Sequence, residues 1–257
     1  MASPKQTEKK LSAQSKEMVV NLDSFAVPIA IVVAGIIIAL AIFLTNSKAD
    51  KDANTDPKKN VPTAQDDPAN AAGGNVSAPI GDSVYLGDKS KAKIAIIEYS
   101  DFQCGHCKTH ADKVYPEIKS KYIDTGKVVY VFKTFSLGES GLGYNTALAF
   151  HCVADLVDAE KAAAFHKGAF GLASDADVKQ LALSLGVNSA KYDTCLTDSK
   201  YKAAVTADKD EGRAATISGT PGFVVGKIGE DGKVTGSLIR GAYPMSTFDS
   251  TIEALSK

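Results

Sequence analysis

The sequence predicts an α/β domain over residues 80–257, in which an all-helical block interrupts a small sheet. Two β-branched apolar runs, at 92–100 and 127–135, flank a segment with helical spacing. An Ala- and Leu-rich stretch of helical period follows over about 139–213, and a hairpin pattern and a last helix come after it. The expected order is therefore β-α-β, a helical block, and β-β-α.

The first strand, "AKIAIIEYS", is continuously apolar, which is typical of a strand buried on both faces. The next segment predicts a helix from Cys107 to about Asp124, because side chains that fit one buried face recur every four positions. Those side chains are His110, Val114, Ile118 and Tyr122. Thr125-Gly126 ends the helix, and "KVVYVFKTF" is the second strand.

The central block carries no strand pattern, and its spacing predicts four or five helices. After it, "GFVVGKIGEDGKVTGSLIRG" reads as two strands joined by a turn at Asp231-Gly232. A final helix is expected from about Met245 to Leu255.

Residues that precede the domain have a different composition. The twenty residues "FAVPIAIVVAGIIIALAIFL" contain no charge and, as a helix, are roughly 30 Å long, which matches a bilayer core. We expect a transmembrane anchor at 25–45 behind a cytoplasmic tail at 1–24. A cleavable signal peptide is the alternative, since "SKA" at 47–49 resembles a cleavage site. Residues 46–79, rich in Ala, Asn, Asp and Pro, predict a disordered linker.

The charge balance excludes some classes of partner. The chain has 29 basic and 30 acidic side chains and a net charge of -1, so it shows no electrostatic footprint for nucleic acid. Lysines flank the apolar span about equally, so the positive-inside rule does not orient it. We place the domain on the extracytoplasmic side because its cysteine chemistry suits an oxidising compartment.

That chemistry lies in "YSDFQCGHCKTH", where Cys104 and Cys107 are two residues apart between a strand and a helix. At a helix start, unpaired main-chain N–H groups and the helix dipole favour a thiolate at Cys104, and a protonated His106 adds to the effect. A lowered pKa makes Cys104 the nucleophile and the better leaving group, while Cys107 lies one turn further in and resolves a mixed disulfide.

A C-x-x-C pair can also belong to a zinc site or form an inert structural disulfide. A zinc site needs a second pair of ligands, but Cys152 and Cys195 stand alone, and His106 and His110 would crowd the same turn. We therefore expect no metal. An inert structural disulfide remains an alternative to a redox pair.

The whole pattern, strand–CGHC–helix–strand, a helical insertion, then "SGTPGF" before a hairpin and a helix, resembles the DsbA-like thiol–disulfide oxidoreductases of the thioredoxin superfamily. The resemblance covers residues 80–257. It implies a thioredoxin fold with an inserted all-helical subdomain. It also implies a redox-active disulfide, Cys104–Cys107, and no bound cofactor.

The resemblance assigns roles to further residues. Gly105 and His106 are the dipeptide that tunes the redox pair, and Gly105 belongs to the face that meets substrate. Thr220-Pro221 corresponds to a cis-proline loop beside Cys104, where it pairs with a substrate strand; an ordinary trans turn is the alternative. Glu98 corresponds to a buried acid that relays a proton to or from Cys107, unless it points to solvent.

Cys152 and Cys195 fall in two predicted helices of the insertion. Some DsbA-like proteins carry an inter-helix disulfide here, and closing so long a loop is worth about 4 kcal/mol on the chain-entropy model. Two separate buried thiols are the alternative.

The resemblance implies a membrane-tethered, single-pass enzyme that introduces disulfides into exported proteins. Its partners are then reduced exported polypeptides, a membrane reoxidase of the DsbB or VKOR type, and the lipid bilayer. However, Gly-His between the cysteines, where DsbA oxidases typically carry Pro-His, weakens the expectation of strong oxidising power. The alternatives are an isomerase or reductase kept reduced by a membrane electron donor, or a tethered, non-catalytic substrate-binding module.

Overall fold

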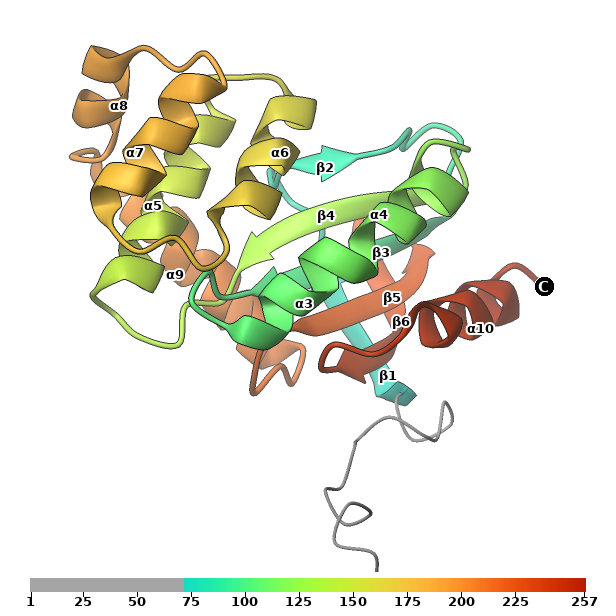
Figure 1. Ribbon diagram of the computed structural model, residues 1–257. Helices are drawn as coiled ribbons and strands as arrows, with labels where there is room; N and C mark the ends of the chain where they lie inside the picture. The colour runs from blue at the N-terminus through green and yellow to red at the C-terminus, as the bar shows by residue number, and fades with distance from the viewer. Residues whose placement is uncertain (1–71) are drawn as a thin grey trace, which may run out of the picture. The chain divides into compact units, whose positions relative to one another are not determined.

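The computed structural model describes residues 72–257, whose arrangement is shown in Figure 1. Six strands form one mixed sheet in the order β1-β6-β5-β3-β4-β2. The strands are β1 Ala72–Pro79, β2 Tyr85–Leu86, β3 Ile94–Ser100, β4 Val128–Thr134, β5 Gly222–Ile228 and β6 Lys233–Arg240. The helices are α3 Gly105–Lys113, α4 Tyr115–Ile118, α5 Leu142–Ala154, α6 Ala159–Ala169, α7 Asp175–Ser184, α8 Ser189–Cys195, α9 Ser199–Ala214 and α10 Met245–Leu255.

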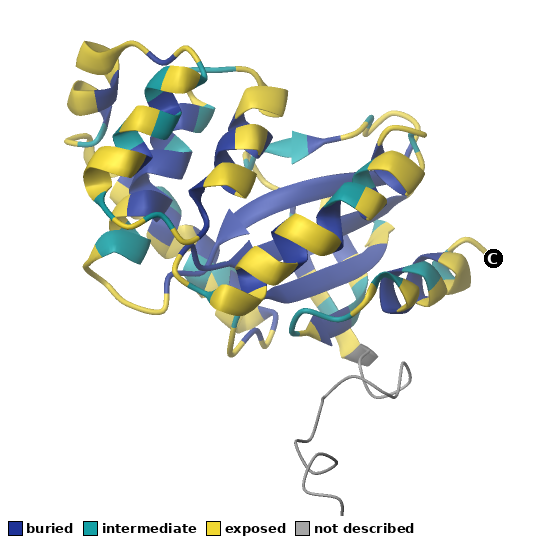
Figure 2. Ribbon diagram, viewed as in Figure 1, coloured by how far each residue is buried: buried dark blue, intermediate teal, exposed yellow. Residues whose placement is uncertain are grey.

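β3 lies inside the sheet and leads directly into the CGHC segment. It pairs in parallel with β4 and antiparallel with β5. Every residue of β3 and β4 is buried, which explains the continuous apolar runs and is visible as the dark central strands of Figure 2. Because β3 is packed along its whole length, its carboxyl end has a fixed position. Cys104, four residues after it, is therefore held in place at the start of α3.

Each face of the sheet has its own apolar core. One face packs against α3, α4, α10 and the insertion, with Ile96, Tyr130 and Phe223 among its buried side chains. The other face, which includes Ile97 and Val224, is covered partly by the end of α9 and the segment after it. Gly212 of α9 allows the close approach, because a Cβ there would lie 2.8 Å from the Phe135 ring.

The helical block consists of five helices, α5 to α9, between β4 and β5, as predicted for about 139–213. Four of them begin at a residue whose side chain accepts a hydrogen bond from a main-chain N–H of the first turn. Those caps are Asp158, Ser174, Asn188 and Asp198. These side-chain caps therefore set where four of the five helices begin.

The predicted end of the linker is wrong. Ala72–Pro79, expected within the disordered linker 46–79, forms β1 and pairs antiparallel with β6, so the folded domain begins before residue 80. In the segment "AGGNVSAP" Val76 and Ala78 pack against the core, and so short an alternation of apolar residues does not predict a strand. The short strand β2, which pairs with β4, was also not predicted.

The helix predicted for 107–124 is interrupted. α3 ends at Lys113, α4 begins at Tyr115, and a π-helical turn, Lys119–Ile123, follows. Pro116 lies in the first turn of α4, where its missing N–H breaks no helical hydrogen bond.

The tail predicted at 1–24, the anchor at 25–45 and the linker residues 46–71 lie outside the described residues. Within residues 72–257, no helix is both long and apolar enough to cross a membrane.

Candidate active site

Cys104 is the N-cap of α3, and Cys107 lies in the first turn of that helix. Cys104 is partly exposed, Cys107 is fully buried, and both are free thiols. The loop before them is held by Asp101, whose carbonyl accepts from the N–H of Cys104 at 3.0 Å. The two thiols therefore sit at the helix start with very different access to solvent.

The Asp101 carboxylate, which the sequence did not single out, ties two loops together. One oxygen accepts from the N–H of Gln103 at 2.7 Å, and the other accepts from the N–H of Leu137 at 2.7 Å. The segment before Cys104 is thus fastened to the loop between β4 and α5.

The loop before β5 lies beside Cys104. The Thr220-Pro221 peptide bond is cis, as the family resemblance implied, and not an ordinary trans turn. The Cys104 thiol donates to the Thr220 carbonyl with a sulfur–oxygen distance of 3.3 Å. A cleft of about 230 Å³ opens along this loop and is lined by residues 217–222, Arg240 and Gly241. The site therefore joins the carboxyl end of β3 to the start of β5.

The surroundings of Cys104 favour its thiolate. A hydrogen bond from the Cys107 thiol lowers the pKa of Cys104 to about 5, together with the Thr220 hydroxyl and the main-chain N–H groups of Cys107 and His106, although burial opposes the shift. The main-chain part is the effect expected at a helix start.

Cys107 behaves in the opposite way. Burial raises the pKa of Cys107, and the hydrogen bond with Cys104 and the negative charge of Glu98 act in the same direction. These opposite shifts favour a partly exposed thiolate at Cys104 and a buried thiol at Cys107 at neutral pH. That difference is what a nucleophile and a resolving thiol require.

Glu98 points into the protein and not to solvent. It is 1% exposed, and its Oε2 accepts from the Tyr130 hydroxyl at 2.8 Å. Burial raises the pKa of Glu98 to about 7, against the opposing effect of the Tyr130 hydrogen bond. A carboxyl group with this pKa can both give and take a proton near neutral pH.

Gly105 and His106 are exposed on the surface above the pair. A Cβ at Gly105 would meet no atom within 4 Å, so open space lies over this turn. The His106 side chain makes no hydrogen bond to any residue in 72–257, and it is the main-chain N–H of His106 that helps to lower the pKa of Cys104. No cluster of three metal-ligating side chains occurs within the described residues.

Cys152 of α5 and Cys195 of α8 are joined by a disulfide, with Cα atoms 5.8 Å apart. The bond lies wholly within the insertion and links two of its helices. It is separate from the thiols at the start of α3.

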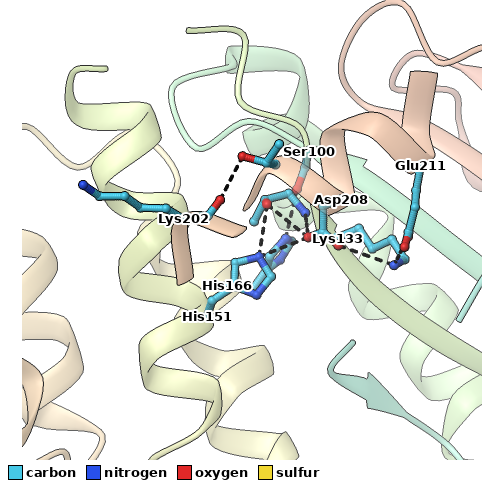
Figure 3. Close-up of polar contacts among 9 residues, drawn as sticks. Ser100, Lys133, His151, His166, Lys202, Asp208 and Glu211 are labelled. Atoms are coloured by element: carbon cyan, nitrogen blue, oxygen red, sulfur yellow. Dashed lines mark hydrogen bonds and ion pairs between the residues drawn. The ribbon is translucent and has the colours of Figure 1, made fainter. Parts of the chain in front are cut away.

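A second polar group lies where β4 meets α5 and α9 (Figure 3). Asp208 of α9 accepts from the N–H of Thr134 at 2.8 Å, and His151 lies 3.1 Å from the same oxygen. Lys133, which is 2% exposed, forms ion pairs with Asp208 and Glu211. We name these residues the α9 clamp, because they fasten the last insertion helix to the end of β4.

The chain is similar to known proteins in sequence and in fold. Residues 80–237 fit the family model described as "Thioredoxin". The chain is 30% identical over 156 residues to "Putative protein-disulfide oxidoreductase" of Rickettsia bellii, covering 56% of this chain and 57% of that protein. The chain spans about half the length of the curated relatives it matches.

Solved structures are similar over most of the described part. The crystal structure of alpha-DsbA1 from Wolbachia pipientis has 27% sequence identity and a TM-score of 0.60, and the match covers 69% of this chain and 92% of that one. BdbD from Bacillus subtilis, at 22% identity and a TM-score of 0.61, is covered completely, with 72% of this chain matched. The second likeness concerns the fold alone.

Proposed function

Because this chain belongs to the thioredoxin family, we propose that it is a thiol–disulfide oxidoreductase that works through Cys104 and Cys107. The observation that carries the proposal is the contrast between the two thiols beside a cis-proline loop. One is partly exposed with a pKa of about 5, and the other is buried with a raised pKa. The printed names of its relatives and structural neighbours support the same class of reaction.

The proposed direction is oxidation of substrate proteins. A substrate thiolate attacks the Cys104 sulfur of the Cys104–Cys107 disulfide, and the Cys107 sulfur leaves and takes up a proton. The second substrate thiolate then attacks the substrate sulfur of the mixed disulfide. This forms the substrate disulfide and releases Cys104 as a thiolate. The substrate loses two electrons and gains a disulfide, and the cysteine pair is reduced to a thiolate at Cys104 and a thiol at Cys107.

The acidity of Cys104 favours this direction. A thiol that ionises easily is a good leaving group, and its stabilised thiolate makes the reduced protein the favoured state. The main-chain atoms of Thr220, beside Cys104, offer a place where an extended substrate segment can pair. Isomerase or reductase activity, with the pair kept reduced, is the alternative, and a non-catalytic binding module is the second.

The proposed setting is the extracytoplasmic side of a membrane. The apolar run at 25–44 supports a single-pass anchor, and the Cys152–Cys195 disulfide suits an oxidising compartment. In that setting the substrates are reduced exported polypeptides. A membrane reoxidase of the DsbB or VKOR type would restore the Cys104–Cys107 disulfide.

The reduction potential of the full chain, equilibrated in glutathione buffers, tests the direction. A reduction potential of about -120 mV would support disulfide donation, and one of about -270 mV would favour the reductase. The Cys104→Ser/Cys107→Ser form, which keeps the Cys152–Cys195 disulfide, is the control and must show no couple near either value. A wild-type chain that also shows none would leave only the binding module.

A further inference from the structure

A chain of hydrogen-bonded side chains runs through the core and ends on α3, the helix whose N-cap is Cys104. Glu98 Oε2 accepts from the Tyr130 hydroxyl at 2.8 Å, and that hydroxyl lies 3.0 Å from His110 Nε2. The three residues come from β3, β4 and α3, and none is more than 1% exposed. Buried polar groups are costly unless paired, so this arrangement has definite hydrogen positions.

The direction of the hydrogens follows from the number of donors. Tyr130 has one hydroxyl hydrogen and gives it to Glu98, so the Tyr130 oxygen must accept from His110. Burial lowers the pKa of His110 to about 3, so the ring is neutral and carries a single N–H, on Nε2. His110 Nδ1 then carries no hydrogen and cannot donate. In agreement, it has no hydrogen-bond partner within residues 72–257.

The other oxygen of Glu98 is left available. Oε1 is buried and has no hydrogen-bond partner among the described residues. Besides burial, the charge of Glu98 raises the pKa of Cys107 and that of Tyr115 of α4, so both side chains lie within its electrostatic reach. Cys107 also lies on α3 three residues before His110, the end of the hydrogen-bonded chain. Across the sheet, its neighbours Phe132 of β4 and Phe223 of β5 carry no charge.

We propose that Tyr130 and His110 are positioning residues, which hold Glu98 by Oε2 so that Oε1 exchanges a proton with Cys107. The inference rests on the proposed function. His110 acts through Tyr130: by donating to the Tyr130 oxygen it makes the Tyr130 hydrogen a stronger donor to Glu98. The Phe223 and Phe248 rings, 4.5 and 5.4 Å from the His110 ring, keep the imidazole in place.

The proton step is simplest in the reaction of the reduced protein with glutathione disulfide. The Cys104 thiolate attacks one sulfur, forms a mixed disulfide and releases one glutathione thiolate. Cys107 then gives its proton to Glu98 Oε1, and its sulfur attacks Cys104 and releases the second glutathione thiolate. The cysteine pair loses two electrons to glutathione, and solvent protonates the released thiolates.

The test follows these two steps separately in the full chain, by acid quench and mass spectrometry between pH 5 and pH 9. Tyr130→Phe keeps the ring and removes the hydrogen bond that stabilises the Glu98 carboxylate. The pH midpoint of the second step should therefore rise by roughly one unit, with the first step unchanged. His110→Phe should shift the second midpoint in the same direction by less, and His110→Gln, which keeps an N–H donor, should restore it.

His166 supplies a matched control. It is 2% exposed, lies among aromatic rings and hydrogen bonds to Ser100 at 3.0 Å, with no bond to Tyr130 or Glu98. His166→Phe removes a comparable buried hydrogen bond and should leave the midpoint of the second step where it is.

Two outcomes would overturn the inference while leaving the proposed function intact. One is an unchanged second midpoint in Tyr130→Phe when Glu98→Gln abolishes that midpoint. The other is an equal shift in His166→Phe and His110→Phe. If the wild-type chain forms no mixed disulfide at Cys104, the proposed function fails, and this inference fails with it.

Discussion

The Thr220 hydroxyl is buried and has no hydrogen-bond partner within residues 72–257. A Cys104 thiolate can accept from that hydroxyl, and the Thr220 side chain is among the groups that lower the pKa of Cys104. The Thr220 hydroxyl therefore accounts for part of the lowered pKa of Cys104. Its contribution can be removed without altering the main-chain conformation.

Thr220→Val replaces the hydroxyl with a methyl group of similar size. We expect the pKa of Cys104 to rise from about 5 by roughly one unit, because one hydrogen bond to the thiolate is lost. Thiolate absorbance followed against pH measures the change. Thr251→Val, a buried threonine of α10, is the control, and an unshifted Thr220→Val curve would contradict the assignment.

Glu98 makes stability depend on pH. Its pKa is about 7 in the folded chain against 4.5 when exposed, so the folded state holds its proton longer than the unfolded state. The stability associated with the neutral carboxyl is complete below about pH 4.5 and is lost as pH rises through 7.

Glu98→Gln removes this titration. In a Cys104→Ser/Cys107→Ser background, the unfolding free energy of the variant relative to its parent should rise by about 3 kcal/mol between pH 4 and pH 8. Denaturant unfolding at the two pH values measures it. A difference that does not depend on pH would show that Glu98 titrates normally.

Among the elements, α9 joins the insertion to the sheet. It ends the insertion, packs on the sheet through Gly212 and holds the end of β4 through the α9 clamp. Lys133 is the buried cation of that clamp, next to Asp208 and Glu211. A buried charge of this kind is stable only while its partners are present.

Lys133→Met leaves a buried carboxylate without its cation. We expect a loss of about 3–5 kcal/mol of unfolding free energy. Lys179→Met is the matched control: the Lys179–Asp193 pair is largely exposed and should cost less than about 1 kcal/mol. Equal effects in the two variants, measured by denaturant unfolding, would contradict a structural role for the clamp.

The elements also show how far the sequence could lead. The strand runs, the helical block, CGHC and Thr220-Pro221 were predictable because each carries its signal within a few residues. Tyr130 lies two residues before Phe132, the parallel partner of Glu98, so strand parity could have placed Tyr130 on the same face. No local pattern links Lys133 to Asp208 or β1 to β6, because those pairings depend on residues brought together only by the fold.

At the scale of the molecule, the acidity of Cys104 links the redox state to stability. Cys104 ionises at about pH 5 when folded and near pH 9 when unfolded, so the unfolded reduced chain binds more protons between those values. Stability of the reduced form therefore rises with pH in this window, and the oxidised form lacks the effect.

The measurement is the thermal unfolding of both redox forms at pH 4 and pH 7, with the Cys152–Cys195 disulfide intact. The difference in Tm, reduced minus oxidised, should be larger at pH 7. A difference that stays constant would mean that Cys104 is not unusually acidic in the folded protein.

The antiparallel pairing of β3 with β5 has a consequence for the order of synthesis. Ile97 lies opposite Val224, with the whole insertion between them in the chain. A growing polypeptide presents Cys104 and Cys107 long before Thr220, the residue that completes their surroundings, has been added. During synthesis the redox pair is therefore an ordinary pair of thiols, and it becomes a distinct chemical site only when nearly all of the chain is available to fold.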